Sequence, residues 1–218
     1  MSAMYGANAV SSAPSPQETL GTAIFAAGRR LVLVRGSAFT TQDLIKEAGV
    51  SLQSFYRYFT AGKDGLLLAL IESMIADHCR DLEHLAEGID DPVARFELYV
   101  RTTLGPLESP EAIAAAQFVT SEHWRLHQTY PREVWAATAP VTELVRAVLV
   151  AGESTGQLAP HKPDRAAWLI TKTMLSAYHH LAFLPDDEGM ETIADDTWTF
   201  CLSAVGGLQS AKKARRRT

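Results

Sequence analysis

Residues 40–59 read TTQDLIKEAGVSLQSFYRYF, in which two short apolar-periodic runs meet at Gly49. Thr40 and Asp43 have the spacing of a capping box, in which the hydroxyl accepts a bond from the later amide and the carboxylate bonds back to the cap. Gly49 ends the first run, where a left-handed backbone is needed and glycine adopts it without steric cost. Ser51 can cap the second run. The stretch therefore predicts a helix-turn-helix, two short helices joined by a turn that contains glycine.

The second of these helices has an apolar face and a polar face. At about 100° per residue, Phe55 and Phe59 lie on one face, where we expect them to pack on the first helix and on residues 17–35. The polar side chains on the opposite face and at its margins are Gln53, Ser54, Tyr56, Arg57 and Tyr58. They supply the hydrogen-bond donors that a DNA major groove and its phosphates require. Spacing alone also fits a solvated face of a helical protein that does not bind DNA.

Helical periodicity continues along the rest of the chain and predicts an all-α fold without internal repeats. The expected helices lie at 17–35, 64–87, after Asp91-Pro92, after Ser109-Pro110, within 121–152, at 163–184 and at 190–208. Pro131 and Pro140 predict two pieces or a kink within 121–152. The segment PDDEG separates the last two helices.

The composition, 47% hydrophobic and 21% charged over 218 residues, is that of a folded globular protein. No run of about eighteen apolar residues occurs, so no membrane-spanning helix is expected. Residues 1–16 lack the features of a secretory signal, and their serine, alanine and proline content predicts a disordered arm. Cys79 and Cys201 have neither metal-site nor disulfide spacing, which fits a cytoplasmic location.

The charge of the chain is unevenly distributed. The net charge of −5 argues against a wholly basic nucleic-acid binder. Residues 1–65 hold six basic and four acidic side chains, which gives +2 and leaves −7 for the remainder. The sign of this N-terminal segment suits phosphate contacts. The basic tail at 212–218 could contact DNA or remain solvated.

Four motifs in order give residues 18–72 a family resemblance. They are the first helix ending in Arg35-Gly36, then TTQDLIKEAGVS, SFYRYF and GKDGLLLAL. This third of the chain resembles the DNA-binding domain of the TetR family of one-component bacterial transcriptional regulators. The remainder matches that family only in length and helical character. The resemblance implies a helix-turn-helix domain at 17–63 and an effector-binding and dimerisation domain at 64–211.

The resemblance also implies which residues contact DNA. Residues 52–58 would form the recognition helix, with Arg57 and Tyr58 at its outer face and margin. Phosphate contacts would come from Thr40, Thr41, Ser54, Tyr56 and Lys63. Base reading would come from Gln42, Leu52 and Gln53, in which glutamine can pair with adenine and leucine can touch a thymine methyl. Many relatives carry a polar residue where Leu52 stands, and the loop 60–62 is one residue longer than usual.

The implied function is a homodimeric repressor that a small, largely apolar effector releases from a palindromic operator. The expected ligand-binding residues are Phe96, Tyr99, Gln117, Phe118, His123, Trp124, Trp135, Thr173, Met174 and Tyr178. The alternative for each of them is packing in a helix-bundle core. The last two helices are expected to form the dimer interface through the small residues Ser176, Ala177, Ala204, Gly206 and Gly207. Alternatively, these helices close the monomer core.

Other chemistries have weaker support in the sequence. His123 and His127 have a helical spacing that can hold a metal, but a third ligand is not evident, so no metal site is predicted. No nucleophile elbow, phosphate loop or dinucleotide fingerprint occurs, and no cofactor is expected. A helical enzyme or a scaffold protein without sequence-specific DNA binding remains the alternative to a regulator.

Overall fold

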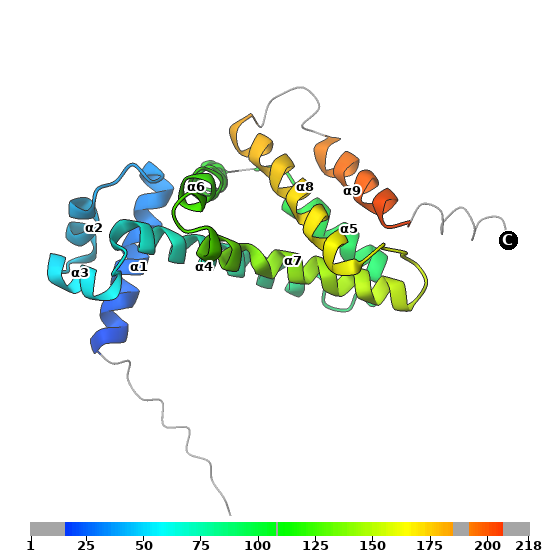
Figure 1. Cartoon of the computed structure of the whole chain (residues 1–218). Helices are drawn as coiled ribbons and strands as arrows, with labels where there is room; N and C mark the ends of the chain where they lie inside the picture. Colours follow the sequence, from blue (N-terminus) through cyan, green and yellow to red (C-terminus); the bar gives the residue numbers. More distant parts are fainter. Residues whose placement is uncertain (1–15, 108, 185–191, 207–218) are drawn as a thin grey trace, which may run out of the picture.

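The computed structural model describes residues 16–107, 109–184 and 192–206, which form nine α-helices and no β-strand (Figure 1). In chain order the helices are α1 (Pro16–Arg35), α2 (Thr41–Ala48), α3 (Leu52–Tyr58), α4 (Gly62–Leu85), α5 (Pro92–Thr103), α6 (Pro110–His127), α7 (Pro131–Ser154), α8 (Pro163–Phe183) and α9 (Ile193–Ala204). The all-α prediction is confirmed. The expected arm, the PDDEG segment, Gly207 and the basic tail lie outside the described residues.

The predicted helix starts at two Asp/Ser-Pro pairs are confirmed. A side-chain oxygen of Asp91 accepts a hydrogen bond from the amide of Val93 at 3.0 Å, at the start of α5. The hydroxyl oxygen of Ser109 accepts one from the amide of Ala112 at 3.0 Å, at the start of α6. In both helices the following proline occupies the first turn, where its missing N–H has no intrahelical partner to lose.

The two prolines expected to interrupt residues 121–152 behave differently. Pro131 begins α7, so the chain does divide there into α6 and α7. Pro140 lies inside α7, which continues as one helix to Ser154. An internal proline removes one backbone hydrogen bond. The packing of α7 against α4, α5 and α8 supports the helix across this position, since tertiary contacts supply most helical stability.

The N-terminal helices share a core with the first half of α4. Its fully buried members include Ile24 of α1, Leu44 of α2, Phe55 of α3 and Leu70 of α4. The same cluster extends to α6 and α7 through residues such as Phe118 and Val134. This continuity fixes the helix-turn-helix against the body of the protein.

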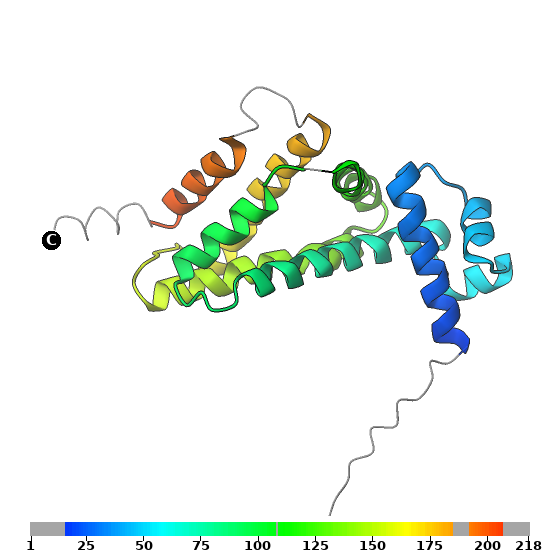
Figure 2. The same ribbon diagram turned by 180° about the vertical axis from the view of Figure 1, so that it is seen from behind.

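A second core lies in the C-terminal part of the chain. It joins the end of α4 to α5, α7, α8 and α9, and it contains Phe96 and Trp198, whose ring centroids are 5.2 Å apart in an edge-on arrangement. Figures 1 and 2 show α1–α3 at one end of the molecule and α9 near the other, with α4 and α7 running along its length. The helix α4 therefore contributes to both cores, and the predicted boundary between residues 63 and 64 falls within its first turn.

Helix α7 is long and apolar enough to cross a membrane by length and composition, with a mean hydropathy of 1.4 over an 18-residue window. The sequence holds no uninterrupted apolar run of that length, because Glu143 and Arg146 lie within the helix, and the expectation of no membrane-spanning helix stays a prediction. Core helices of globular folds satisfy the same two criteria. Although only 28% of the window is buried, α7 packs against α4, α5, α6 and α8 at the centre of the fold.

Candidate functional site

The turn between α2 and α3 has the predicted local geometry. The amide of Thr40 and its hydroxyl both donate to the Asp43 carboxylate, at 2.8 and 2.7 Å, and the Thr40 hydroxyl oxygen accepts from the amide of Asp43 at 3.1 Å. These bonds lower the pKa of Asp43, with the backbone bond from Thr40 as the largest cause. Gly49 follows α2 with φ 66° and ψ 32°, the left-handed conformation that favours glycine. The capping box and the turn are confirmed.

The apolar face of α3 packs inward as expected. Phe55 is fully buried, and its ring lies 5.7 Å from that of Phe59 and 5.2 Å from that of Tyr56. The Ser51 hydroxyl caps the helix by accepting from the amide of Ser54 at 3.1 Å. These contacts fix the rotation of α3 and determine which of its residues face outward.

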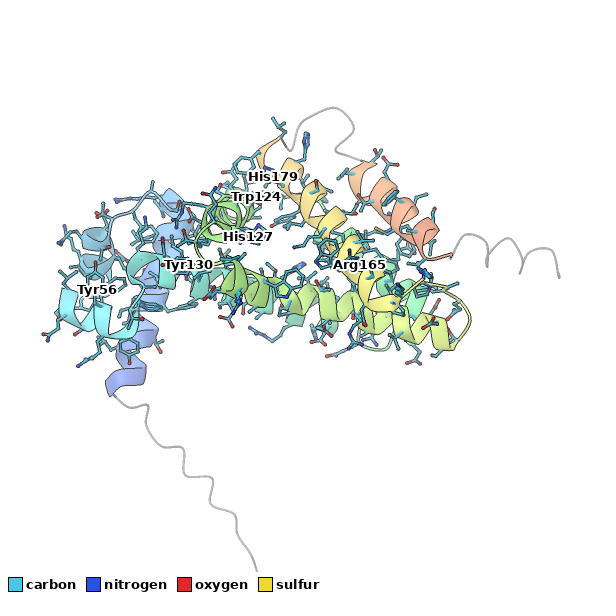
Figure 3. The ribbon with its side chains drawn as sticks, in the orientation of Figure 1. Tyr56, Trp124, His127, Tyr130, Arg165 and His179 are labelled. Atoms are coloured by element: carbon cyan, nitrogen blue, oxygen red, sulfur yellow. The ribbon has the colours of Figure 1, made fainter. Side chains whose placement is uncertain are left out.

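Four residues of α3 face solvent together: Leu52, Gln53, Tyr56 and Arg57. Tyr56 lies at the outer edge of the helix (Figure 3). Leu52 is 44% exposed at the first position of α3, so an apolar side chain stands among polar ones on this face. The face offers an amide, a phenol and a guanidinium, which are donors suited to base edges and phosphates.

Two other predicted contact residues of α3 are partly engaged within the protein. The Ser54 hydroxyl accepts a hydrogen bond from that of Ser51 at 2.9 Å. The ring of Tyr58 lies so close to α1 that a Cβ atom at Gly21 would come within 2.8 Å of it. Tyr58 therefore packs against the backbone of α1. Among the residues predicted from α2 and its cap, Thr40 and Gln42 are exposed and Thr41 is partly buried.

Lys63 is bound within the protein rather than exposed for a phosphate. Its ammonium donates to the backbone oxygens of Ser37 and Phe39, at 2.5 and 2.6 Å, and lies 4.7 Å from the centroid of the Phe39 ring. Burial is the largest cause of its lowered pKa. A phosphate contact would have to compete with these bonds to the loop between α1 and α2. The predicted DNA contact of Lys63 stays a prediction, and the structure gives it a second role.

A network of charges joins the start of α4 to α6. Arg125 donates through Nη2 to Asp64 and through Nε to Glu122, both at 2.6 Å. The side chain of Glu122 is only 4% exposed. The network lies at the junction between the helix-turn-helix and the larger helical body.

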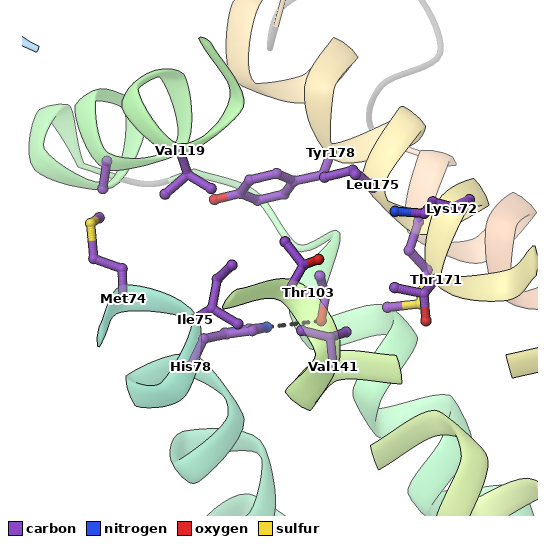
Figure 4. A pocket seen from close by; sticks show the side chains of 13 residues that line it. Met74, Ile75, His78, Thr103, Val119, Val141, Thr171, Lys172, Leu175 and Tyr178 are labelled. Carbon is purple, nitrogen blue, oxygen red and sulfur yellow. Dashed lines mark hydrogen bonds between the residues drawn. The ribbon is translucent and has the colours of Figure 1, made fainter. Parts of the chain in front are cut away.

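The larger body contains a cavity of about 250 Å³ between α4, α5, α6, α7 and α8 (Figure 4). Most of the atoms lining it are apolar. The lining residues are Met74, Ile75, His78, Thr103, Ala115, Val119, Thr138, Val141, Thr171, Lys172, Met174, Leu175 and Tyr178. Its mainly apolar lining is that of a small-molecule site, although its volume lies just below the usual range of about 300–1,000 Å³.

Several polar groups of the cavity are satisfied by the protein. The Nε2 atom of His78 lies 3.0 Å from the hydroxyl of Thr103, the bond drawn in Figure 4. The Thr138 and Thr171 hydroxyls donate to backbone oxygens of their own helices. Burial lowers the pKa of His78 and of Lys172, and it raises the pKa of Tyr178. The site therefore favours a neutral His78 and a neutral phenol.

Residues 24–70 match the family model described as "Bacterial regulatory proteins, tetR family". The resemblance to the TetR family is therefore confirmed for this N-terminal segment. The matched family is one of DNA-binding transcriptional regulators, which supports the regulator class inferred from the sequence over the enzyme alternative. No curated protein sequence matches the chain.

Solved structures support the fold of this chain over most of its length. Reduced Escherichia coli NemR shares 20% identity over 85% of this chain and 96% of that one, with a TM-score of 0.65. Thermus thermophilus FadR, a repressor in complex with lauroyl-CoA, shares 19% sequence identity over 84% of this chain and 93% of that one, with a TM-score of 0.66. RolR in complex with resorcinol shares 16% sequence identity over 90% of this chain and 93% of that one, with a TM-score of 0.65.

Two of the ten predicted ligand residues, Met174 and Tyr178, line the cavity. Phe96 and Tyr99 are buried in the C-terminal core instead. Gln117 and Phe118 line a separate, more open hollow of about 460 Å³ against the end of α1. The alternative of core packing thus describes the two residues of α5.

The remaining predicted ligand residues lie outside the cavity. His123 is 6% exposed and stacks on His127 with ring centroids 5.8 Å apart. Burial, followed by the charges of Lys172 and His127, lowers the pKa of His123 to about 4. Trp124 is exposed and donates to Nδ1 of His179 at 3.2 Å, the pair seen in Figure 3.

Trp135 and Thr173 complete the set. Trp135 is exposed and lines a small depression beside the cavity, and the Thr173 hydroxyl donates to the backbone oxygen of Leu169. The described part of the chain holds no group of three metal-ligating side chains, so the His123 and His127 pair gains no third ligand there.

The sequence reasoning missed the α4 and α7 contributions to the cavity, and it also missed Lys172. One signal was available: Thr171, Met174, Leu175 and Tyr178 recur at helical spacing and mark the face of α8 that looks toward α4. The lining residues of α4, α5 and α7 carry no comparable signal, because their faces alternate between core and cavity.

Proposed function

We propose that the chain is a homodimeric repressor that binds a palindromic operator and is released from it by a small effector bound in the cavity. The observation that carries the proposal is one continuous body that holds both a helix-turn-helix with an exposed face and an apolar cavity of about 250 Å³. Helix α6 lines the cavity through Ala115 and Val119, and its Arg125 forms an ion pair with Asp64 of α4. Effector binding would act by favouring a conformer in which the two α3 helices of the dimer no longer have the spacing that the operator requires.

The dimer would form through α8 and α9. Both helices expose large apolar side chains, Leu169 and Phe183 on α8 and Phe200 on α9, beside the exposed small residues Ser176 and Ala204. Ala177 packs against the monomer core instead of joining this surface. Two copies related by a twofold axis could bury these exposed residues of α8 and α9 in a four-helix interface. The dimer would then present two recognition helices to successive major grooves.

The operator contacts divide into two classes. Gln53 and Gln42 are exposed and can read adenine, and Leu52 can only favour a thymine methyl. Tyr56 and Arg57 are exposed as well, which supports contacts from both to the DNA backbone. We therefore expect an operator half-site that contains A·T pairs opposite the start of α3.

A gel-shift titration on the DNA upstream of the protein's own gene, repeated over a salt series, tests the proposal. Specific binding with a log–log salt slope of about −0.9 per phosphate contact is expected. Gln53→Ala should change the preferred sequence, whereas Gln128→Ala, at an exposed glutamine beyond the end of α6, should not. Binding without sequence preference, or no binding at all, would reject the repressor and restore a helical scaffold as the better interpretation.

A further inference from the structure

Lys172 occupies an unusual position at the edge of the cavity. It lines both the cavity and the adjoining depression, and its ammonium lies 5.5 Å from the centroid of the Trp135 ring. Within the described ranges it forms no salt bridge or hydrogen bond. Glu143 lines the same depression, but its carboxylate accepts from Arg146 at 2.7 Å.

The ammonium of Lys172 is therefore partly desolvated without a counter-ion. Burial is the only cause of its lowered pKa, and no described carboxylate acts against it. Charges removed from water are ordinarily paired, because desolvation disfavours the charged form. His123 on α6 is the titratable neighbour that feels the Lys172 charge; with a pKa of about 4 it is neutral near pH 7, and its protonated form would be a second cation rather than a counter-ion. An anion entering the cavity would meet an unpaired cation.

The rest of the cavity is suited to an apolar body. Met74, Ile75 and Val119 lie on the side away from Lys172 in Figure 4, and the His78 and Thr103 side chains satisfy each other. One end of the cavity thus carries the Lys172 ammonium, and the other end is mostly hydrocarbon, with the Tyr178 hydroxyl pointing to that side in Figure 4. A ligand that fills it needs a matching polarity along its length.

The volume sets the size of that ligand. A cavity of ~150 Å³ holds benzene, so in proportion a cavity of about 250 Å³ holds roughly ten non-hydrogen atoms. We propose that the effector is a compact apolar carboxylate of about this size, whose carboxylate pairs with Lys172. The inference rests on the proposed function, since it takes the cavity to be the effector site.

Matched probes separate charge from shape. We would titrate 3-phenylpropionate, octanoate and 1-naphthoate, each against its own primary amide, into the full-length protein by calorimetry. The amide has the same number of non-hydrogen atoms but no charge. At least one carboxylate should bind about tenfold or more tightly than its amide, with a Kd below about 1 mM.

Three variants test whether Lys172 is the cause. Lys172→Met should weaken the carboxylate about tenfold or more and leave the affinity of the amide within about twofold. Lys172→Arg keeps the charge and should keep the preference. Lys162→Met removes a lysine from the residue before α8, about 15 Å away along the helix axis, and should change neither. Circular dichroism of each variant checks that it is folded.

The outcomes distinguish the two proposals. If no carboxylate of the panel binds, if the amides bind equally well, or if Lys172→Met keeps the preference, the carboxylate assignment is wrong even though operator binding persists. If the wild-type protein does not bind its upstream DNA, the repressor proposal fails whatever the calorimetry shows. A carboxylate that binds through Lys172 and lowers operator affinity supports both.

Discussion

Replacing Arg125 with methionine should destabilise the protein by leaving a buried carboxylate without its partner. Arg125 is the side chain that donates to Glu122, through Nε at 2.6 Å, and the Glu122 side chain is 4% exposed. Removing one member of a buried ion pair costs about 3–5 kcal/mol. Lys63 lies close enough to feel the Glu122 charge, and Arg125 is itself half-exposed. We therefore expect a loss nearer 2–3 kcal/mol.

A matched pair elsewhere in the chain provides the control. Arg146 donates through Nε to Glu143 at 2.7 Å with the same sequence separation, but Glu143 is mostly exposed. Arg146→Met should leave the urea midpoint unchanged within error, because water replaces the lost contact. The two variants differ mainly in the burial of the remaining carboxylate, and the comparison isolates that variable.

Urea unfolding followed by tryptophan fluorescence, at one fixed protein concentration, measures the effect. The double variant Glu122→Gln/Arg125→Met should recover most of the loss, to within about 1 kcal/mol of the wild type, because no buried charge then remains. If Arg125→Met and Arg146→Met shift the midpoint equally, burial of Glu122 does not control the energetics. A double variant no more stable than Arg125→Met would refute the reasoning in the same way.

The other predictions concern the turn, the pH response and the dimer. Gly49→Ala should cost about 1–2 kcal/mol in urea unfolding, because the added Cβ meets no neighbour but the backbone is left-handed; Gly49→Asn should cost less. Stability should fall as the pH drops from about 6.5 toward 4, by at most about 1.4 kcal/mol per unit, because unfolded His123 binds a proton that the folded form excludes. His123→Gln should reduce that slope, and the slope that remains should come from His78, whose pKa burial also lowers; an unchanged slope would refute the assignment to His123. Phe200→Asp, at a residue 62% exposed on α9, should yield monomers in sedimentation and abolish operator binding, whereas Leu85→Asp, at an exposed leucine of α4, should do neither.

The helix-turn-helix could be predicted in detail because its determinants are local. The capping box joins Thr40 to Asp43, Gly49 needs only its own backbone freedom, and Phe55 and Phe59 are one helical turn apart. Each signal operates within a few residues, so the sequence displays it directly. Lys63 is the exception, because its backbone partners lie 24 and 26 residues earlier in the chain.

The cavity could not be predicted to the same depth, because five helices build it. The sequence analysis predicted mainly aromatic ligand-binding residues, but Phe96 is buried in the core and Trp135 faces solvent. The residues that line the cavity are mostly methionine, valine, leucine and threonine. Helical periodicity identifies the apolar face of a helix. It does not show whether that face packs against a neighbouring helix or lines a cavity. The role of Lys172 at the cavity could not be predicted for a related reason. A lysine on a helix is ordinarily solvated, and only the tertiary structure shows that Lys172 is partly buried.

The contacts between the cavity and α3 suggest how occupancy could reach DNA. Any ligand that fills the cavity presses on Ala115 and Val119, and α6 can respond only as a unit because a helix is stiff along its axis. The far end of α6 holds Asp64 through Arg125, and the adjacent Lys63 holds the loop that leads into α2. A shift of α6 would therefore strain the first turn of α4, and it would also act on α1, against which α6 packs. Breaking the link with Arg125→Met should leave effector binding intact but shrink the effector-induced loss of operator affinity, and an undiminished response would assign the coupling to the apolar contacts between α1 and α6.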